Sequence, residues 1–166
     1  MSPNRHNCLP YNQRRRHKAQ IPAGSVSRQP TANIDHYPTL LAAAGAMADS
    51  RQKLDGISLL RVWQKPDKQF KRDPLYWHYP LEKPHFLGGR SSGAIRDGDW
   101  KLIEFFDDGR RELYNLRLDI GEDDDRLDAE PAIAADLHNQ LAAWRESVAA
   151  KIPAPNPTWE PPPVVA

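Results

Sequence analysis

Residues 92–116 read SGAIRDGDWKLIEFFDDGRRELYNL, and they give the clearest indication of the fold. The DG at 97–98 and the DDG at 107–109 separate three short runs that contain apolar side chains. An Asp-Gly pair between two such runs favours a tight hairpin, because glycine readily adopts the positive φ that the turn requires. Two of these turns in succession predict an antiparallel meander. The predicted strands are residues 94–96, 100–106 and 111–116.

A fourth strand and a long helix complete the predicted domain. Residues 75–79, LYWHY, are rich in aromatic side chains and stop at Pro80, which indicates a strand. Residues 81–93 contain several glycines and are predicted to be a loop. Residues 131–151 carry apolar side chains on one stripe of an amphipathic helix, which would cover the meander. The stripe consists of Ile133, Leu137, Leu141, Trp144 and Val148. We therefore predict an α+β fold, with about four antiparallel strands packed against one long C-terminal helix.

The first part of the chain is predicted to form a smaller helical segment. A helix is expected over residues 35–44, with Asp35 as its N-cap and Gly45 as its C-terminal stop. A short apolar turn of helix follows and ends near Trp63. Residues 64–74 are charged and contain two prolines, so they are predicted to be a linker between two structural units.

Both ends of the chain have compositions that disfavour a packed core. Residues 1–20 are basic and nearly free of apolar side chains, which predicts a disordered or aberrant N-terminus. A nucleic-acid-binding arm is the less favoured alternative, because the segment has almost no aromatic residues. The segment also lacks an apolar core, so it predicts no secretory signal. Residues 153–166 contain six prolines and are predicted to form an extended tail.

The whole-chain composition argues against several classes of protein. The 166 residues correspond to one average domain, and 39% apolar residues with 16 prolines predict a modest core. The net charge of +1 favours neither a nucleic acid nor a membrane as partner. Cys8 is the only cysteine, so neither an intrachain disulfide nor a thiolate zinc site is expected. No apolar run is long enough to predict a transmembrane helix.

Five blocks of residues occur in order along the chain: IDHYPTLLAAAG at 34–45, LDGISLL at 54–60, SGAIRDGDWKLI at 92–103, ELYNL at 112–116 and DIGE at 119–122. Together they resemble type I sulfatases, which are formylglycine-dependent members of the alkaline phosphatase superfamily. In that family, blocks like the first two end the large N-terminal domain, and the others belong to a small C-terminal subdomain. The resemblance spans about residues 22–157, with 21–63 as a remnant of the larger domain and 75–152 as the subdomain.

The resemblance implies hydrolysis of a sulfate ester, in a sulfated glycan or an aryl sulfate, by a calcium-bound formylglycine. The family makes that group from the Cys or Ser of a Cys-x-Pro-Ser-Arg motif, but here the CLP at 8–10 continues as YN. The acidic run at 122–125 is predicted to be a solvated turn rather than a calcium site, because contiguous carboxylates point apart. We therefore expect no catalytic residue and no metal site in this chain, and no activity of the chain alone. Family members are usually periplasmic, secreted or lysosomal.

Three residues are candidates for binding a sulfated substrate. His78 lies between aromatic residues in the predicted first strand, and His85 and Arg90 lie in the glycine-containing loop that follows. The resemblance places this region near the mouth of the substrate cleft, and a guanidinium suits bidentate recognition of sulfate oxygens. The structural alternatives are a half-buried, hydrogen-bonded histidine and a solvated loop arginine.

Two hypotheses follow for the function. The first is a fragment of a sulfatase whose C-terminal subdomain lines the substrate cleft. The alternative is a non-catalytic binding or interaction module, or a truncated gene remnant without a stable fold. Sulfate ester turnover and the cooperativity of unfolding would separate them. The first hypothesis also predicts a partly exposed apolar patch on the N-terminal segment, formed by Leu40, Leu41, Leu59 and Leu60.

Overall fold

The computed structural model describes residues 21–81 and 89–152, which belong to two compact units. Unit 1 ends at Arg72 and unit 2 begins at Asp73. Each unit has its own helices or strands, and the two units are described separately below. Across these described ranges, no helix has the length and apolar character needed to span a bilayer.

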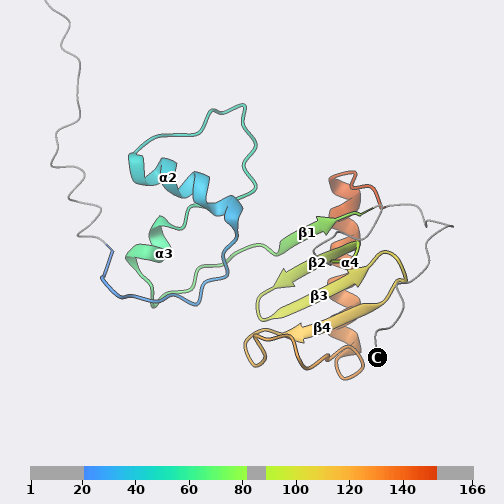
Figure 1. Ribbon diagram of the computed structural model, residues 1–166. Helices are drawn as coiled ribbons and strands as arrows, with labels where there is room; N and C mark the ends of the chain where they lie inside the picture. The colour runs from blue at the N-terminus through green and yellow to red at the C-terminus, as the bar shows by residue number, and fades with distance from the viewer. Residues whose placement is uncertain (1–20, 82–88, 153–166) are drawn as a thin grey trace, which may run out of the picture. The chain divides into compact units, whose positions relative to one another are not determined.

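Unit 2 is built on a four-stranded antiparallel sheet in the order β1-β2-β3-β4, which Figure 1 shows. The predicted meander and the strand before it are therefore confirmed. Gly98 and Gly109 take φ values of 56° and 71° at the two turns, as the Asp-Gly signals require. The strands are β1 (Leu75–Tyr79), β2 (Ser92–Asp97), β3 (Trp100–Phe105) and β4 (Arg111–Asn115).

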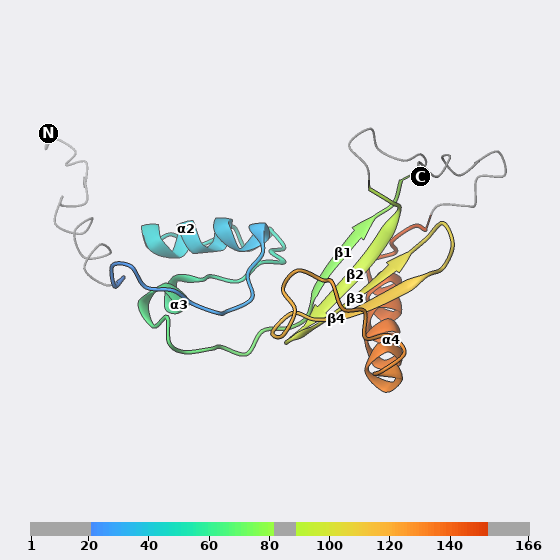
Figure 2. The same cartoon turned by 60° about the horizontal axis from the view of Figure 1, so that its bottom comes forward.

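Helix α4 (Pro131–Ser147) covers one face of this sheet, as Figures 1 and 2 show together. Ile95, Leu102 and Leu113 on three neighbouring strands are fully buried and form one cluster with Leu137 and Leu141 of the helix. Each such side chain stabilises the fold by about 1.5–3 kcal/mol before entropy is subtracted. The α+β architecture predicted from the sequence is therefore correct.

The C-terminal end of the long helix differs from the prediction. Helix α4 stops at Ser147, four residues before the predicted end at residue 151, because Ala149 adopts a positive φ of 51°. Val148 was expected on the buried stripe, but it lies beyond the helix and is 49% exposed. Arg145 is buried in the last turn instead, where its side chain contacts the sheet.

Unit 1 contains three short helical elements, η1 (Asn33–Asp35), α2 (His36–Ala44) and α3 (Leu60–Gln64). Gly45 ends α2 in the left-handed conformation, as predicted. Asp35 precedes α2 as expected, but its side chain makes no capping hydrogen bond to that helix. The expected capping role was wrong, because the carboxylate is engaged with other segments.

The Asp35 clasp is the central polar contact of unit 1. The Asp35 carboxylate is fully buried and accepts hydrogen bonds from the backbone N–H groups of Ala32 (2.8 Å) and Ile57 (3.0 Å). The Arg72 guanidinium donates to both oxygens at 2.7 and 2.9 Å. Burial acts to raise the pKa of Asp35, but Arg72 and the two backbone donors outweigh it and hold the pKa below its ordinary value.

The segment predicted to be a linker is attached to unit 1 over much of its length. The Gln29 amide donates to the carbonyl of Phe70 (3.0 Å) and accepts from its N–H (2.7 Å), and Arg72 belongs to the Asp35 clasp. The Gln29 side chain is buried at the contact. This double hydrogen bond and the clasp fix the path of the chain after α3.

The expected apolar patch of unit 1 is only partly present. Leu40 is 65% exposed, and Leu41 and Leu60 are partly buried, in agreement with the prediction. Leu59 is only 3% exposed, so its predicted exposure was wrong. Its N–H donates to the hydroxyl of the buried Thr39 (2.8 Å), which ties the start of α3 to α2.

Candidate functional site

Charged and aromatic side chains from several segments lie together at the end of the sheet where β2 begins. The register pairs Tyr79 with Ser92 and Ser92 with Phe105, so β1 and β3 end where β2 begins. Because side chains alternate along a strand, Phe105 lies on the face opposite the buried Leu102, away from α4. We call the following group the strand-end cluster: Arg90, Phe105, Asp107, Asp108, Arg110 and Glu112.

Arg90 is held in place by two carboxylates. Its Nε and Nη2 donate to Asp107 at 3.0 and 2.8 Å, and Nη2 also donates to Asp108 at 2.7 Å. The guanidinium carbon lies 4.6 Å from the centre of the Phe105 ring. A planar guanidinium suits both contacts at once, which a lysine could not reproduce.

The turn between β3 and β4 places the partners of Arg90. The N–H of Gly109 donates to the carbonyl of Phe105, and the Asp108 side chain accepts from the N–H of Arg110, both at 2.9 Å. The Arg110 guanidinium carbon lies 4.5 Å from the Phe105 ring centre, and its side chain also pairs with Glu112. The same tight turn that closes the hairpin therefore presents two carboxylates and a second guanidinium beside Arg90.

The positive and negative charges of the strand-end cluster nearly cancel. Hydrogen bonds that Arg90 donates to Asp108 and Asp107 raise the pKa of Arg90, and Arg90 in turn lowers the pKa of Asp108. Two guanidinium and three carboxylate groups are present, so the cluster offers both donors and charged acceptors. The Arg90 side chain is 38% exposed and the Asp108 side chain 47% exposed, so both are accessible to a polar ligand.

His78 does not belong to the strand-end cluster. It pairs with Gly93 on the face of the sheet that α4 covers, next to the ring of Phe106 at 5.2 Å between centroids. Its Nε2 donates to the carbonyl of Lys151 at 2.9 Å. Its Nδ1 is buried and has no hydrogen-bond partner in the part of the chain that the structure describes. The structure thus places His78 and Arg90 on opposite faces, and His85 lies outside the described residues.

A second ionic group joins the sheet to α4. Glu104 on β3 pairs with Arg145 and accepts from His138 Nε2 at 3.2 Å. Burial tends to raise the pKa of Glu104, but the two cationic partners outweigh it and lower that pKa. His138 was not among the candidates chosen from the sequence, so this contact was missed. The signal was the seven-residue spacing of His138 and Arg145, which puts both on one face of a helix.

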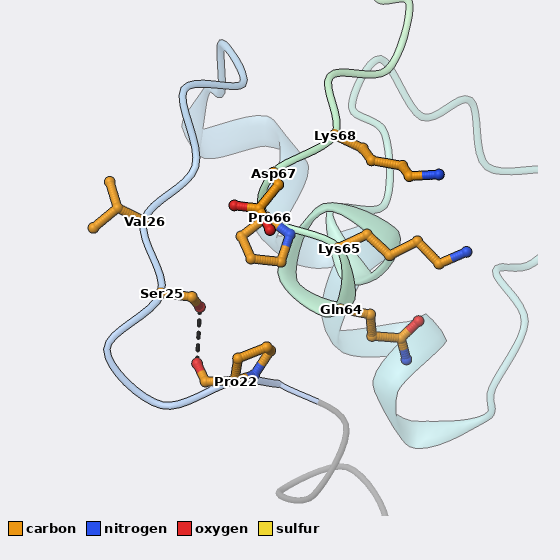
Figure 3. Close-up of a pocket in the computed structure, with 8 residues that line it drawn as sticks. All are labelled: Pro22, Ser25, Val26, Gln64, Lys65, Pro66, Asp67 and Lys68. Atoms are coloured by element: carbon orange, nitrogen blue, oxygen red, sulfur yellow. Dashed lines mark hydrogen bonds between the residues drawn. The ribbon is translucent and has the colours of Figure 1, made fainter.

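The described residues also include a hollow in unit 1, but no cluster of potential metal ligands. No group of three or more His, Cys, Asp or Glu side chains within residues 21–81 and 89–152 could hold a metal ion. A hollow of about 520 Å³ in unit 1 is lined mainly by residues 22–26 and 64–68. Figure 3 shows that the Lys65 and Lys68 side chains point away from it. Cys8 and the CLP at 8–10 lie outside the described residues.

The fold and a family match place this chain in the class of sulfatase C-terminal domains. A sequence model of the family described as N-sulphoglucosamine sulphohydrolase, C-terminal, matches residues 14–147. The chain belongs to this family, whose relatives are sulfatases of the alkaline phosphatase superfamily. The match begins earlier and ends earlier than the span of about 22–157 expected from the sequence blocks.

Two curated relatives are sulfatases. One, from Formosa agariphila, is described as a sulfatase and is 32% identical over 127 residues, which cover 70% of this chain and 23% of the relative. The other, from Bacteroides thetaiotaomicron, is described as an N-acetylglucosamine-6-O-sulfatase and is 34% identical over 110 residues. That alignment covers 64% of this chain and 19% of the relative. The chain therefore spans about a quarter or less of these relatives.

Solved structures show the same fold. The protein BT4656, in complex with its substrate D-glucosamine-2-N,6-O-disulfate, superposes with a TM-score of 0.64 at 28% identity. The match covers 77% of this chain and 26% of that protein. The protein Ps i-CgsB, also solved in complex with k-i-k-neocarrahexaose, superposes with a TM-score of 0.62 at 29% identity. That match covers 75% of this chain and 26% of the other.

Proposed function

We propose that this chain is the C-terminal part of a sulfatase that acts on a sulfated glycan, and that its strand-end cluster contacts the substrate. The observation that carries the proposal is the family match over residues 14–147, together with the likeness to a structure in complex with a glucosamine disulfate. The activity belongs to the longer proteins of the family, of which this chain spans about a quarter.

The chemistry of the strand-end cluster suits sugar hydroxyl groups as well as a sulfate. Carboxylates accept hydrogen bonds from hydroxyl groups, and a planar guanidinium donates to oxygen atoms in pairs. Because Asp107 and Asp108 already neutralise Arg90, the cluster attracts a sulfate less strongly than an unpaired arginine would. We infer that it contacts mainly the sugar ring of the substrate and orients it.

Calcium and formylglycine supply the nucleophile and electrophilic assistance in the family that this chain resembles. Among the described residues, no group of three or more His, Cys, Asp or Glu side chains could hold the calcium ion. We propose that the residues holding both groups belong to a part of the sulfatase outside this chain. His78, as a substrate-binding residue, would need the contact with Lys151 to open.

The proposal is tested by titrating the isotopically labelled full chain with D-glucosamine-2-N,6-O-disulfate and recording amide chemical shifts. We expect the largest shifts at Arg90 and at residues 107–109. Removing the guanidinium, Arg90→Met, should weaken binding at least about tenfold, since a charge-assisted contact of about 1.5–3 kcal/mol is lost. Arg90→Lys should weaken it too, because lysine lacks the planar fork.

Arg117 provides a matched control. It pairs with Asp99 at 3.2 Å at the opposite end of the sheet, where β2 ends and β3 begins, and both side chains are exposed. Arg117→Met removes one guanidinium from the same unit and should leave the titration unchanged. Shifts confined to other regions, or equal weakening by the control, would refute the role of the strand-end cluster.

A further inference from the structure

Charge is divided unevenly between the two units. The described residues of unit 1, 21–72, contain eight Arg and Lys against four Asp, a net charge of +4. Those of unit 2, 73–81 and 89–152, contain nine Arg and Lys against 16 Asp and Glu, a net charge of −7. The whole-chain charge of +1 hides this division. Unit 1 therefore has a positive field that total composition does not reveal.

Ion pairs within unit 1 leave most of its cations without a carboxylate partner. Arg51 pairs with Asp49, and Arg72 pairs with Asp35 in the clasp. The carboxylates that remain in residues 21–72 are Asp55 and Asp67. The remaining cations are all exposed, and no ion pair joins any of them to another described residue. They are Arg28, Lys53, Arg61, Lys65, Lys68 and Lys71.

Most of these cations lie together on α3 and the chain that follows it. The N–H of Lys68 donates to the carbonyl of Lys65 at 3.0 Å, and Figure 3 shows both side chains extending to the same side. The Arg61 guanidinium carbon lies 5.0 Å from the centre of the Phe70 ring. The contacts of Gln29 with Phe70 bring residue 28 close to residue 71. We call Arg28, Arg61, Lys65, Lys68 and Lys71 the basic surface.

The backbone beneath the basic surface is fixed. The Gln29 amide makes two hydrogen bonds to Phe70, and Arg72 is bound by the fully buried Asp35. Both contacts hold the segment that carries the lysines against the rest of unit 1. A ligand would therefore meet cations on an ordered backbone, and ordering the backbone would cost little on binding.

We propose that the basic surface binds a polyanionic sulfated glycan chain through several of its sulfate groups. Five exposed cations without carboxylate partners complement a polymer that carries a permanent negative charge at each sulfate. The choice of a glycan rests on the proposed function. A nucleic acid is less suited, because Trp63 and Phe70 in this segment are partly buried and Arg61 lies over the Phe70 ring.

The test measures binding of heparin to the full chain at several salt concentrations. The triple variant Lys65→Gln/Lys68→Gln/Lys71→Gln should raise the dissociation constant at least about tenfold at low salt. The slope of log affinity against log salt should fall by about 2–3, since each lost contact removes roughly one unit. The matched control, Arg96→Gln/Arg117→Gln/Arg126→Gln, removes the same charge from the acidic unit 2, where Arg117 and Arg126 pair with carboxylates, and should change both quantities much less.

Several outcomes would overturn the proposal. They are equal weakening by both triple variants, equal affinity for chemically desulfated heparin, and tighter binding of single-stranded DNA than of heparin. The measurement is separable from the test of the strand-end cluster. Shifts at residues 107–109 caused by the monosaccharide disulfate should persist in the lysine variant. Loss of heparin binding with those shifts intact supports the basic surface whether or not the strand-end cluster contacts substrate.

Discussion

Removing the guanidinium from the Asp35 clasp should destabilise unit 1 far more than removing a similar exposed one. Arg72→Met leaves the fully buried Asp35 carboxylate with only two backbone donors. Breaking a buried ion pair in this way costs about 3–5 kcal/mol. Residue-resolved hydrogen exchange should therefore show a large loss of protection at Ile57 and Leu59, with unit 2 amides unchanged.

Arg51→Met is the matched control, because Arg51 also pairs with an aspartate through both carboxylate oxygens but is largely exposed. It should leave the exchange pattern unchanged. The pH dependence gives a second readout. Since the folded pKa of Asp35 is lowered from 3.8, its stabilising effect is complete above about pH 5 and is lost as the pH falls below 3.8. Arg72→Met should reduce this acid sensitivity. Equal effects of the two variants would refute the reasoning.

Three further substitutions test individual contacts. Thr39→Val should cost about 1–3 kcal/mol in denaturant unfolding, because the buried N–H of Leu59 loses its acceptor, whereas Thr39→Ser should cost much less. Gly56→Ala should prevent the native packing of unit 1, since the added carbon would lie 2.1 Å from the carbonyl oxygen of Ile34, and circular dichroism would detect it. Burial and nearby carboxylates raise the pKa of Tyr114 from 10.0 to about 12, so its contribution to stability holds below pH 10 and is lost as the pH rises through about 12. Tyr114→Phe should remove that loss in alkaline unfolding measurements.

The sheet of unit 2 could be predicted because its signals are local. The Asp-Gly turns need a positive φ at Gly98 and Gly109, and the short runs beside these turns contain apolar residues. The stripe on α4 likewise follows from helical periodicity. The end of that helix could not be predicted, because the left-handed conformation of Ala149 depends on tertiary context rather than on a glycine.

The contacts between distant segments could not be predicted. Asp35 has the sequence position of an N-cap, but its partners Ile57 and Arg72 lie 22 and 37 residues away. A helix-cap pattern gives no information about such distances. Arg90 was chosen for its chemistry, yet its partners Asp107 and Asp108 become neighbours only through the pairing of β2 with β3.

We predict that this chain alone does not hydrolyse a sulfate ester, and an assay of sulfate release tests this prediction. The purified full chain would be incubated with D-glucosamine-2-N,6-O-disulfate, with and without calcium, and free sulfate measured by ion chromatography. The account predicts no release above the uncatalysed background in either condition, while the same preparation still shows substrate-induced shifts at residues 107–109. Calcium-dependent sulfate release would contradict it, because the catalytic residues would then have to lie within this chain.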